Sequence, residues 1–127
     1  MTDQLPPYWF ENLPRMRDAL DKSGGCYEPE DVLSMLQDND NAFWLATPTS
    51  FLMAEVMTYP RKRVFNWSVA AGDMDELLGF GRRFAALGLQ MGCSEAQLMG
   101  RPGWERRLSN YRKVAVILRC PLRELLQ

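Results

Sequence analysis

The segment at residues 50–58, SFLMAEVMT, constrains the fold of this chain more than any other, because both faces of an extended strand would be apolar there. Successive side chains of a strand point to opposite faces. One face carries Phe51, Met53 and Met57, and the other carries Leu52, Ala54 and Val56. A strand of this kind must be covered on both sides, so we expect it inside a sheet that has helices on each face.

Two further strand-like runs, at residues 42–46 and 63–71, lie on either side of this segment. The joins between them are Pro48-Thr49 and the four residues 59–62. Joins this short suit antiparallel hairpins. The three runs therefore predict an antiparallel meander.

Helical periodicity is found before and after the meander. Residues 9–20 and 28–38 are predicted helices, and the second has Pro29 and acidic residues in its first turn. A third helix is expected over residues 73–87, closed by Gly88, with Gly81 allowing close packing on the sheet. The stripe predicted to face the sheet consists of Met74, Leu77, Leu78, Gly81, Phe84 and Ala85.

The rest of the chain predicts a short strand at residues 95–99, a helix at 102–110 and a last strand at 114–119. Antiparallel strands thus come first and a β-α-β crossover follows, which places the fold in the α/β (α+β) class. We expect a mixed, mostly antiparallel twisted sheet of about five to six strands, with about four helices on its two faces.

Several classes of function are excluded by composition. Histidine is absent, which removes a His general base, a Ser-His or Cys-His nucleophile pair and any His-containing metal site. The three cysteines lie far apart without metal-ligand spacing, so we expect no metal and no disulfide framework. The net charge of -1 favours neither a nucleic-acid nor a membrane partner. No signal peptide or membrane span is recognisable, which predicts a cytosolic location.

Residues 92–108 read GCSEAQLMGRPGWERRL, which contains a GC pair, a short strand and a GR-x-GW-x-R-x-L run. With residues 64–72, this run resembles the small GNAT-like proteins of tailed bacteriophages, within the GNAT acetyltransferase superfamily. The resemblance implies a single GNAT-like domain at residues 13–127, preceded by an N-terminal arm at residues 1–12. The phage group includes relatives of the internal virion protein A of short-tailed phages. Membership implies a protein partner from the virion or the host, and a location in the virion or the host cytoplasm.

Active members of this superfamily bind the pyrophosphate of acetyl-CoA at a Q/R-x-x-G-x-G/A loop that opens the central helix. The equivalent residues 69–76 read VAAGDMDE, with one glycine and no basic residue. Asp73 and Glu76 have the spacing of a reciprocal helix cap, and the acidic first turn would repel a pyrophosphate. We therefore expect a structural helix start and no cofactor. If the chain is instead an active N-acetyltransferase, the resemblance implies acetyl-CoA contacts at Val69, Ala71 and Gly72.

The same alternative implies catalytic roles for Glu55 and Tyr111. Glu55 lies in an apolar strand, where a raised pKa would suit a general base for an unknown amine. The other interpretation of Glu55 is an ion pair with Arg63 or another basic residue across the hairpin. Tyr111 lies near the position of the acid that protonates the leaving thiolate, although a packed tyrosine is the other interpretation and Tyr59 has an equal claim.

Two groups of residues are candidates for binding a protein partner. The aromatic run Tyr8, Trp9 and Phe10 is too apolar for a free tail, so it either packs on the domain or docks a partner. Arg101 and Trp104 belong to a sharp strand-to-helix turn, where Trp104 could pack on the sheet and Arg101 could meet an acidic partner. A homo-oligomer is left open. The preferred hypothesis is a phage-encoded, degenerate GNAT-like protein with a structural or protein-binding role.

Overall fold

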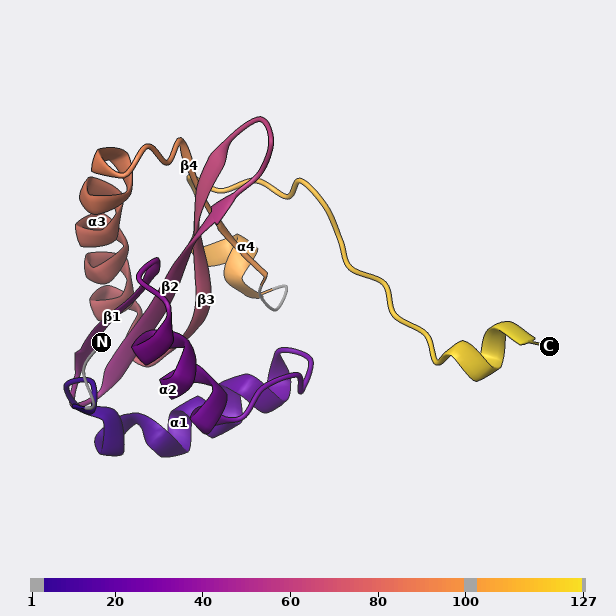
Figure 1. The fold of residues 1–127 in the computed structure, drawn as a ribbon, viewed down its shortest axis with the longest axis horizontal. Helices are drawn as coiled ribbons and strands as arrows, with labels where there is room; N and C mark the ends of the chain where they lie inside the picture. The colour runs from indigo at the N-terminus through magenta and orange to yellow at the C-terminus, as the bar shows by residue number, and fades with distance from the viewer. Residues whose placement is uncertain (1–3, 100–102, 127) are drawn as a thin grey trace.

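The computed structural model describes residues 4–99 and 103–126, which form a single sheet with helices on both faces (Figure 1). The elements in chain order are α1 (Trp9–Lys22), α2 (Pro29–Asp38), β1 (Ala42–Thr47), β2 (Ser50–Thr58), β3 (Arg63–Ala71), α3 (Met74–Gln90), β4 (Glu95–Leu98), α4 (Gly103–Arg107) and the 3-10 helix η1 (Leu122–Leu126). Helix α3 lies on one side of the sheet, and α1 and α2 lie on the other.

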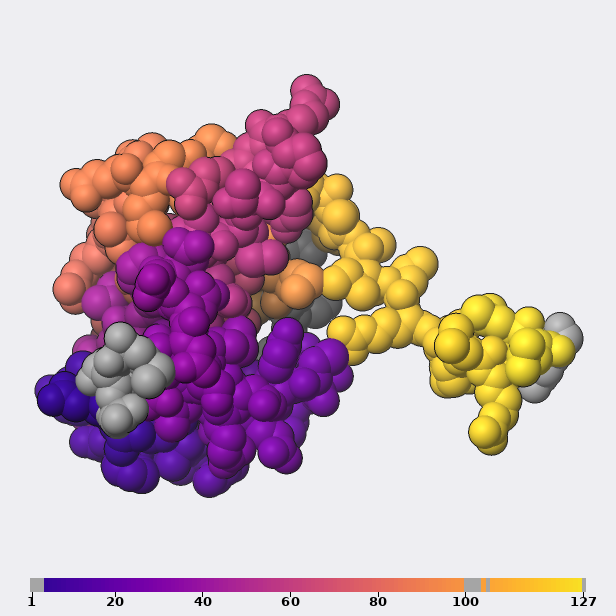
Figure 2. All heavy atoms as spheres, viewed as in Figure 1, coloured from indigo at the N-terminus to yellow at the C-terminus, as the bar shows by residue number. Residues whose placement is uncertain are grey.

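The sheet has the strand order β1-β2-β3-β4. Strands β1, β2 and β3 form the predicted antiparallel meander, and β4 pairs parallel to β3 after the crossover through α3. The expected five to six strands are wrong for the described residues, which contain four strands. Residues 114–119 were predicted as a strand, but they lie in an extended segment that projects from the body (Figure 2). Their apolar pattern is local, whereas a strand also needs a partner edge.

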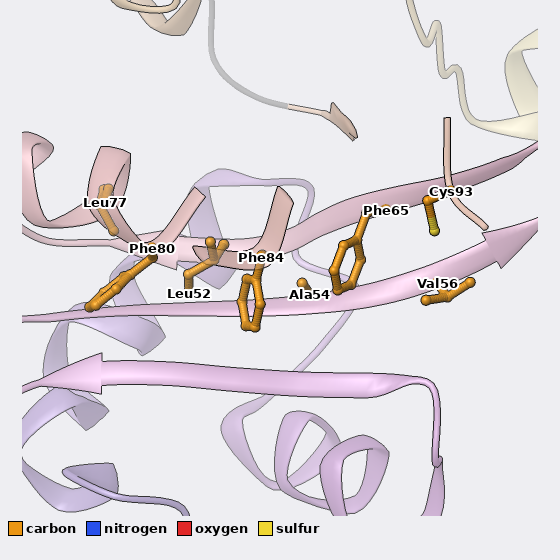
Figure 3. Close-up of a cluster of buried hydrophobic side chains, with 8 residues drawn as sticks. All are labelled: Leu52, Ala54, Val56, Phe65, Leu77, Phe80, Phe84 and Cys93. Carbon is orange, nitrogen blue, oxygen red and sulfur yellow. The ribbon is translucent and has the colours of Figure 1, made fainter. Parts of the chain in front are cut away.

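Both faces of β2 are buried, as its sequence predicts. One cluster lies between the sheet and α3, and it consists of Leu52, Ala54, Val56, Phe65, Leu77, Phe80, Phe84 and Cys93 (Figure 3). A second lies between the sheet and helices α1 and α2, and it consists of Trp9, Met16, Leu20, Val32, Phe51, Met53 and Val69. The helix layers on both sides therefore follow from the two apolar faces of one strand.

Helix α1 includes residues that the sequence assigned to the N-terminal arm. It begins at Trp9, directly after Tyr8 in the left-handed conformation (φ 58°), and Pro14 lies inside it rather than in its first turn. The buried Asn12 donates from Nδ2 to the carbonyl oxygens of Tyr8 (2.9 Å) and Thr47 (3.0 Å). This amide joins the start of α1 to the end of β1.

Helix α3 is longer than predicted, and the residues that it buries differ from the predicted stripe. Its buried positions are Leu77, Phe80, Phe84 and Gly88. Gly88 was predicted to close the helix, but it lies inside it. A Cβ there would come within 2.7 Å of Cδ2 of Phe65, and this close packing explains the glycine. Gly81, expected to allow close packing, has no neighbouring atom within 4 Å of the Cβ position. Facing side chains on the sheet therefore decide which glycine is needed.

These two glycines give opposite predictions for the same substitution. Gly81→Ala should raise the free energy of unfolding by about 0.5–1 kcal/mol, because alanine favours the helix and the added methyl meets open space. Gly88→Ala should lower it by about 1–3 kcal/mol, because the methyl collides with the ring of Phe65. Urea denaturation of both variants measures the difference. Equal effects at the two positions would contradict the packing described for α3.

Candidate functional site

Strands β3 and β4 separate halfway along β3. Their pairing runs from Val64↔Glu95 to Trp67↔Leu98, and β3 then continues alone on that side to Ala71. At the same point the pairing of β3 with β2 steps from Trp67 to Val69, which leaves Ser68 as a β-bulge. Among the residues that the structure describes, the edge of β3 from residue 68 to residue 71 therefore has no neighbouring strand on that side.

The bulge changes which face each side chain of β3 occupies. Trp67 stacks on Phe84 on the α3 side, whereas Ser68 bonds to Glu55 and Val69 joins the core under α1 and α2. Two successive residues thus point to the same face, as in a bulge.

A cavity of about 370 Å³ fills the gap between the two strands. Its walls are mostly apolar and come from β3, β4, α3 and the segment around α4. The lining includes Trp67, Val69, Ala70, Leu77, Gly81, Leu98, Met99, Trp104, Leu108 and Tyr111, with Arg82 and Lys22 as basic members. Lys22 pairs with Asp18 at 3.0 Å. Such a space suits an extended, largely apolar group.

Tyr111, a predicted catalytic candidate, lines this cavity. Its hydroxyl oxygen accepts a hydrogen bond from Nε1 of Trp67 at 2.7 Å, which holds it beside the last pair of β3 and β4. Tyr59, the competing candidate, lies beyond β2 and is exposed, and its hydroxyl contacts Nε2 of Gln97 at 3.4 Å. The structure therefore brings Tyr111, and not Tyr59, to the cavity wall.

Glu55 lies on the opposite face of the sheet from Trp67. Its Oε1 accepts from the hydroxyl of Ser68 (2.7 Å), which accepts from Nδ2 of Asn66 (3.0 Å). Asn66 in turn accepts from Nε2 of Gln97 (3.1 Å), so a polar row crosses three strands. The other interpretation, an ion pair of Glu55 with Arg63 or another basic residue, is not seen among the described residues, where the carboxylate bonds to Ser68. Arg63 instead donates to Thr58 and to the carbonyl of Met91, because α3 extends far enough to meet it.

The polar row was missed by sequence reasoning. Asn66 and Ser68 alternate with Phe65 and Trp67 in β3, and this alternation was the one available signal. Ser68 lies 13 residues away in sequence from its partner Glu55. Pairing register decides that contact, and a bulge in the register could not be read from residue types.

The start of α3 is capped by side chains of Asp73, Ser50 and Glu76. Oδ1 of Asp73 accepts from the backbone amide of Glu76 at 3.0 Å, which confirms the predicted cap. The reciprocal half is different from the prediction. The amide of Asp73 donates to the hydroxyl of Ser50 (2.8 Å), and that hydroxyl donates to Oε1 of Glu76 (2.6 Å). A buried serine of β2 thus connects the two ends of the cap.

Glu76 also accepts from the hydroxyl of Thr49 at 2.7 Å. These hydrogen bonds, that from Ser50 first and that from Thr49 second, lower the pKa of Glu76 below its ordinary value. The carboxylate is therefore ionised at neutral pH. Together with Asp73 and Asp75 it makes the first turn of α3 strongly negative.

Close packing against β2 requires a glycine at position 72. Its φ is +130°, and a Cβ there would lie 2.5 Å from Cα and 2.3 Å from Oγ of Ser50. The turn from β3 into α3 therefore presses directly on the first residue of β2. Val69, Ala71 and Gly72, the predicted cofactor contacts, border this turn, and Val69 also lines the cavity.

The aromatic candidates for a partner surface are divided by the fold. Trp9 is 5% exposed and packs on Trp44 with ring centroids 5.5 Å apart, so it belongs to the core. Tyr8 and Phe10 are exposed. Trp104 is half-buried and lines the cavity, and Arg101 lies outside the described residues. Among the residues described, no cluster of three metal-ligating side chains and no helix able to span a membrane is found.

Comparisons with solved structures show the same architecture. TTHA1254 from Thermus thermophilus, solved as a point mutant, superposes with a TM-score of 0.59 at 18% identity, over 87% of this chain and 92% of that protein. The V. cholerae integron cassette protein VCH_CASS6 gives 0.58 at 9% identity, over 92% and 90%. The aminoglycoside acetyltransferase meta-AAC0020 from soil, solved with sisomicin, gives 0.55 at 14% identity, over 88% and 87%.

The chain has an acetyltransferase-like fold. No family model matches the sequence, and no curated protein is detectably similar to it. At these levels of identity the likeness concerns the fold alone. The expected phage origin stays a prediction.

The contact between Gly72 and Ser50 can be tested by substitution. Gly72→Ala should lower the free energy of unfolding by about 2–4 kcal/mol, because it adds both a strained positive φ and a collision with backbone. Gly25→Ala is the matched control, since Gly25 has φ +66° but no atom within 4 Å of the Cβ position, and about 1 kcal/mol is expected there. If denaturation shows Gly72→Ala to be no worse than Gly25→Ala, the proposed role of Ser50 is wrong.

The hydrogen-bonded carboxylate of Glu76 predicts a pH dependence of stability. Because its folded pKa is lowered, its contribution is fully present above its ordinary pKa of 4.5 and is lost as pH falls through the folded value. Wild type should therefore exceed Glu76→Gln in free energy of unfolding at neutral pH, and the difference should shrink in acid. Glu30→Gln, at an exposed position, is the control. A difference independent of pH would argue against the ionised carboxylate as the stabilising group.

Proposed function

We propose that this chain is a protein-binding or structural component built on an acetyltransferase-like fold, and that it does not bind acetyl-CoA efficiently. The observation that carries the proposal is the closed start of α3. Two of the amides at this turn already have acceptors within the protein: the amide of Glu76 donates to the carboxylate of Asp73, and the amide of Asp73 donates to the hydroxyl of Ser50. A helix start serves as an anion site only while its amides are free.

The charge around this turn supports the same conclusion. Asp73, Asp75 and Glu76 place three carboxylates where a pyrophosphate would lie. Two like charges about 4 Å apart repel by about 4 kcal/mol at an effective dielectric of 20, which exceeds the net value of two hydrogen bonds. Arg82 also lines the cavity, and Lys22, its other basic residue, is paired with Asp18.

The cofactor side of this proposal predicts the response to acetyl-CoA. The melting temperature should not change with acetyl-CoA up to millimolar concentrations, whereas binding at 100 times a dissociation constant would add about 2.7 kcal/mol. Calorimetry on wild type and on Ala70→Leu, which narrows the cavity, completes the test. Micromolar binding that Ala70→Leu abolishes would overturn the proposal.

The partner side rests on exposed apolar side chains and on the phage-like run at residues 92–108. Tyr8 and Phe10 are exposed at the start of α1. Of the described residues in the two predicted docking sites, these are the exposed ones. The proposed partner is a phage virion protein or a host protein, and the proposed location is the virion or the host cytoplasm. Mass spectrometry of purified particles of the encoding phage tests this placement.

An active N-acetyltransferase is the second candidate, and the cavity beside Tyr111 favours it. This candidate gives Glu55 the role of base and Tyr111 the role of acid, with Val69, Ala71 and Gly72 near the cofactor. The residues at the start of α3 do not fit the pyrophosphate of that cofactor. Because one structural neighbour is an aminoglycoside acetyltransferase, sisomicin is the first acceptor to test. Acetyl transfer to it that Tyr111→Phe reduces would favour this candidate.

A further inference from the structure

The C-terminal segment after Tyr111 is an extended apolar run that pairs with no strand among the described residues. Residues 114–118 read VAVIL, and Val114, Val116, Ile117 and Leu118 are 83%, 66%, 60% and 88% exposed. The segment stands apart from the body in both views (Figures 1 and 2). Five consecutive apolar residues in water are unfavourable, so a partner surface is expected to cover them.

The composition of this segment specifies what kind of partner it needs. Branched residues dominate it, neither glycine nor proline interrupts residues 112–120, and Pro121 ends it. These are properties of a strand that is buried on both faces. A strand requires hydrogen bonds to another strand along its edge, because its own amide and carbonyl groups cannot pair with one another.

The sheet offers a free edge close to the origin of the segment. β1 and β4 are the edge strands, and β4 pairs only with β3 among the residues described. Tyr111 is fixed to Trp67, which pairs with Leu98 of β4. The β1 edge lies three strands away, roughly 14 Å at about 4.8 Å per strand. The β4 edge is therefore the nearer acceptor.

The hydrogen bond between Tyr111 and Trp67 places the origin of the segment beside β4, and Arg112 follows Tyr111 directly. The pKa of Glu95, the first residue of β4, is lowered chiefly by its hydrogen bond from Lys62 at 2.8 Å, and the charge of Arg112 adds to the effect. The donor strand and the acceptor edge thus begin at nearly the same place. Two copies related by a twofold axis at this place need only a short crossing of their chains.

Contacts at the other end hold the segment away from the edge of its own sheet. Nη1 of Arg119 donates to the carbonyl of Gly24 at 3.3 Å, and Nη2 contacts Sγ of Cys26 at 3.4 Å. Both acceptors lie in the α1–α2 loop. Residues 114–118 therefore span open space between Tyr111 and this loop.

We propose that two copies of this chain exchange their C-terminal segments, so that residues 114–118 of each add as a strand to the free β4 edge of the other. Each copy carries one donor strand and one acceptor edge, and a reciprocal exchange uses both. A different protein that paired with residues 114–118 would leave the β4 edge unpaired. A different protein that paired with the β4 edge would leave residues 114–118 exposed. The dimer closes on itself, as a twofold exchange must.

Sedimentation equilibrium tests the proposal over a range of protein concentrations. Wild type should have twice the mass of the chain, and Ile117→Pro should have the mass of one chain, because proline removes an amide from the strand. Leu122→Pro is the matched control outside the strand and should remain a dimer. Both substitutions lie outside the folded body, so the circular dichroism spectrum of the body should be unchanged.

Hydrogen exchange of residues 113–119 identifies what covers the strand. Protection that rises with protein concentration and disappears in Ile117→Pro is expected. A monomer with protected amides would mean closure on its own β4 edge, and a monomer without protection would mean no strand. Larger open assemblies, or a dimer that survives Ile117→Pro, would place the contact elsewhere. Each of these four results would overturn the exchange.

Discussion

Burial of β2 on both faces is the constraint on which the rest of the structure depends. Alternate residues of this strand enter two separate cores, one under α3 and one under α1 and α2. Phe51 and Met53 are inaccessible on one side, and Ala54 is inaccessible on the other. Because neither face can be left to solvent, both helix layers must be present, and β1 and β3 must flank the strand to satisfy its backbone.

Ser50, the first residue of β2, also positions the start of α3. It presses on Gly72 and bonds both to the amide of Asp73 and to Glu76. The end of β3, the turn and the first turn of the helix are thus positioned by one buried hydroxyl. The same contacts give the amides of Asp73 and Glu76 acceptors within the protein.

The cavity and the closed helix start lead to different expectations about function. The bulge at Ser68 lies in the pairing of β3 with β2, next to the point where the pairing with β4 ends, and Tyr111 lines the cavity there. The acidic first turn of α3 follows directly after β3, whose residues line the cavity. The apolar segment at residues 114–118 is exposed beyond Tyr111.

Local patterns in the sequence determined the meander, the two-sided burial of β2 and the Asp73 cap, since each depends on residues adjacent or three apart in the chain. Tertiary structure alone decided the features that depend on distant residues. The ring of Phe65 leaves no room for a side chain at Gly88, Ser50 completes the cap across 26 residues, and the bulge gives Glu55 its partner Ser68. The apolar run at residues 114–118 shows the limit most clearly. Its sequence specifies a strand, but a strand exists only where another edge pairs with it.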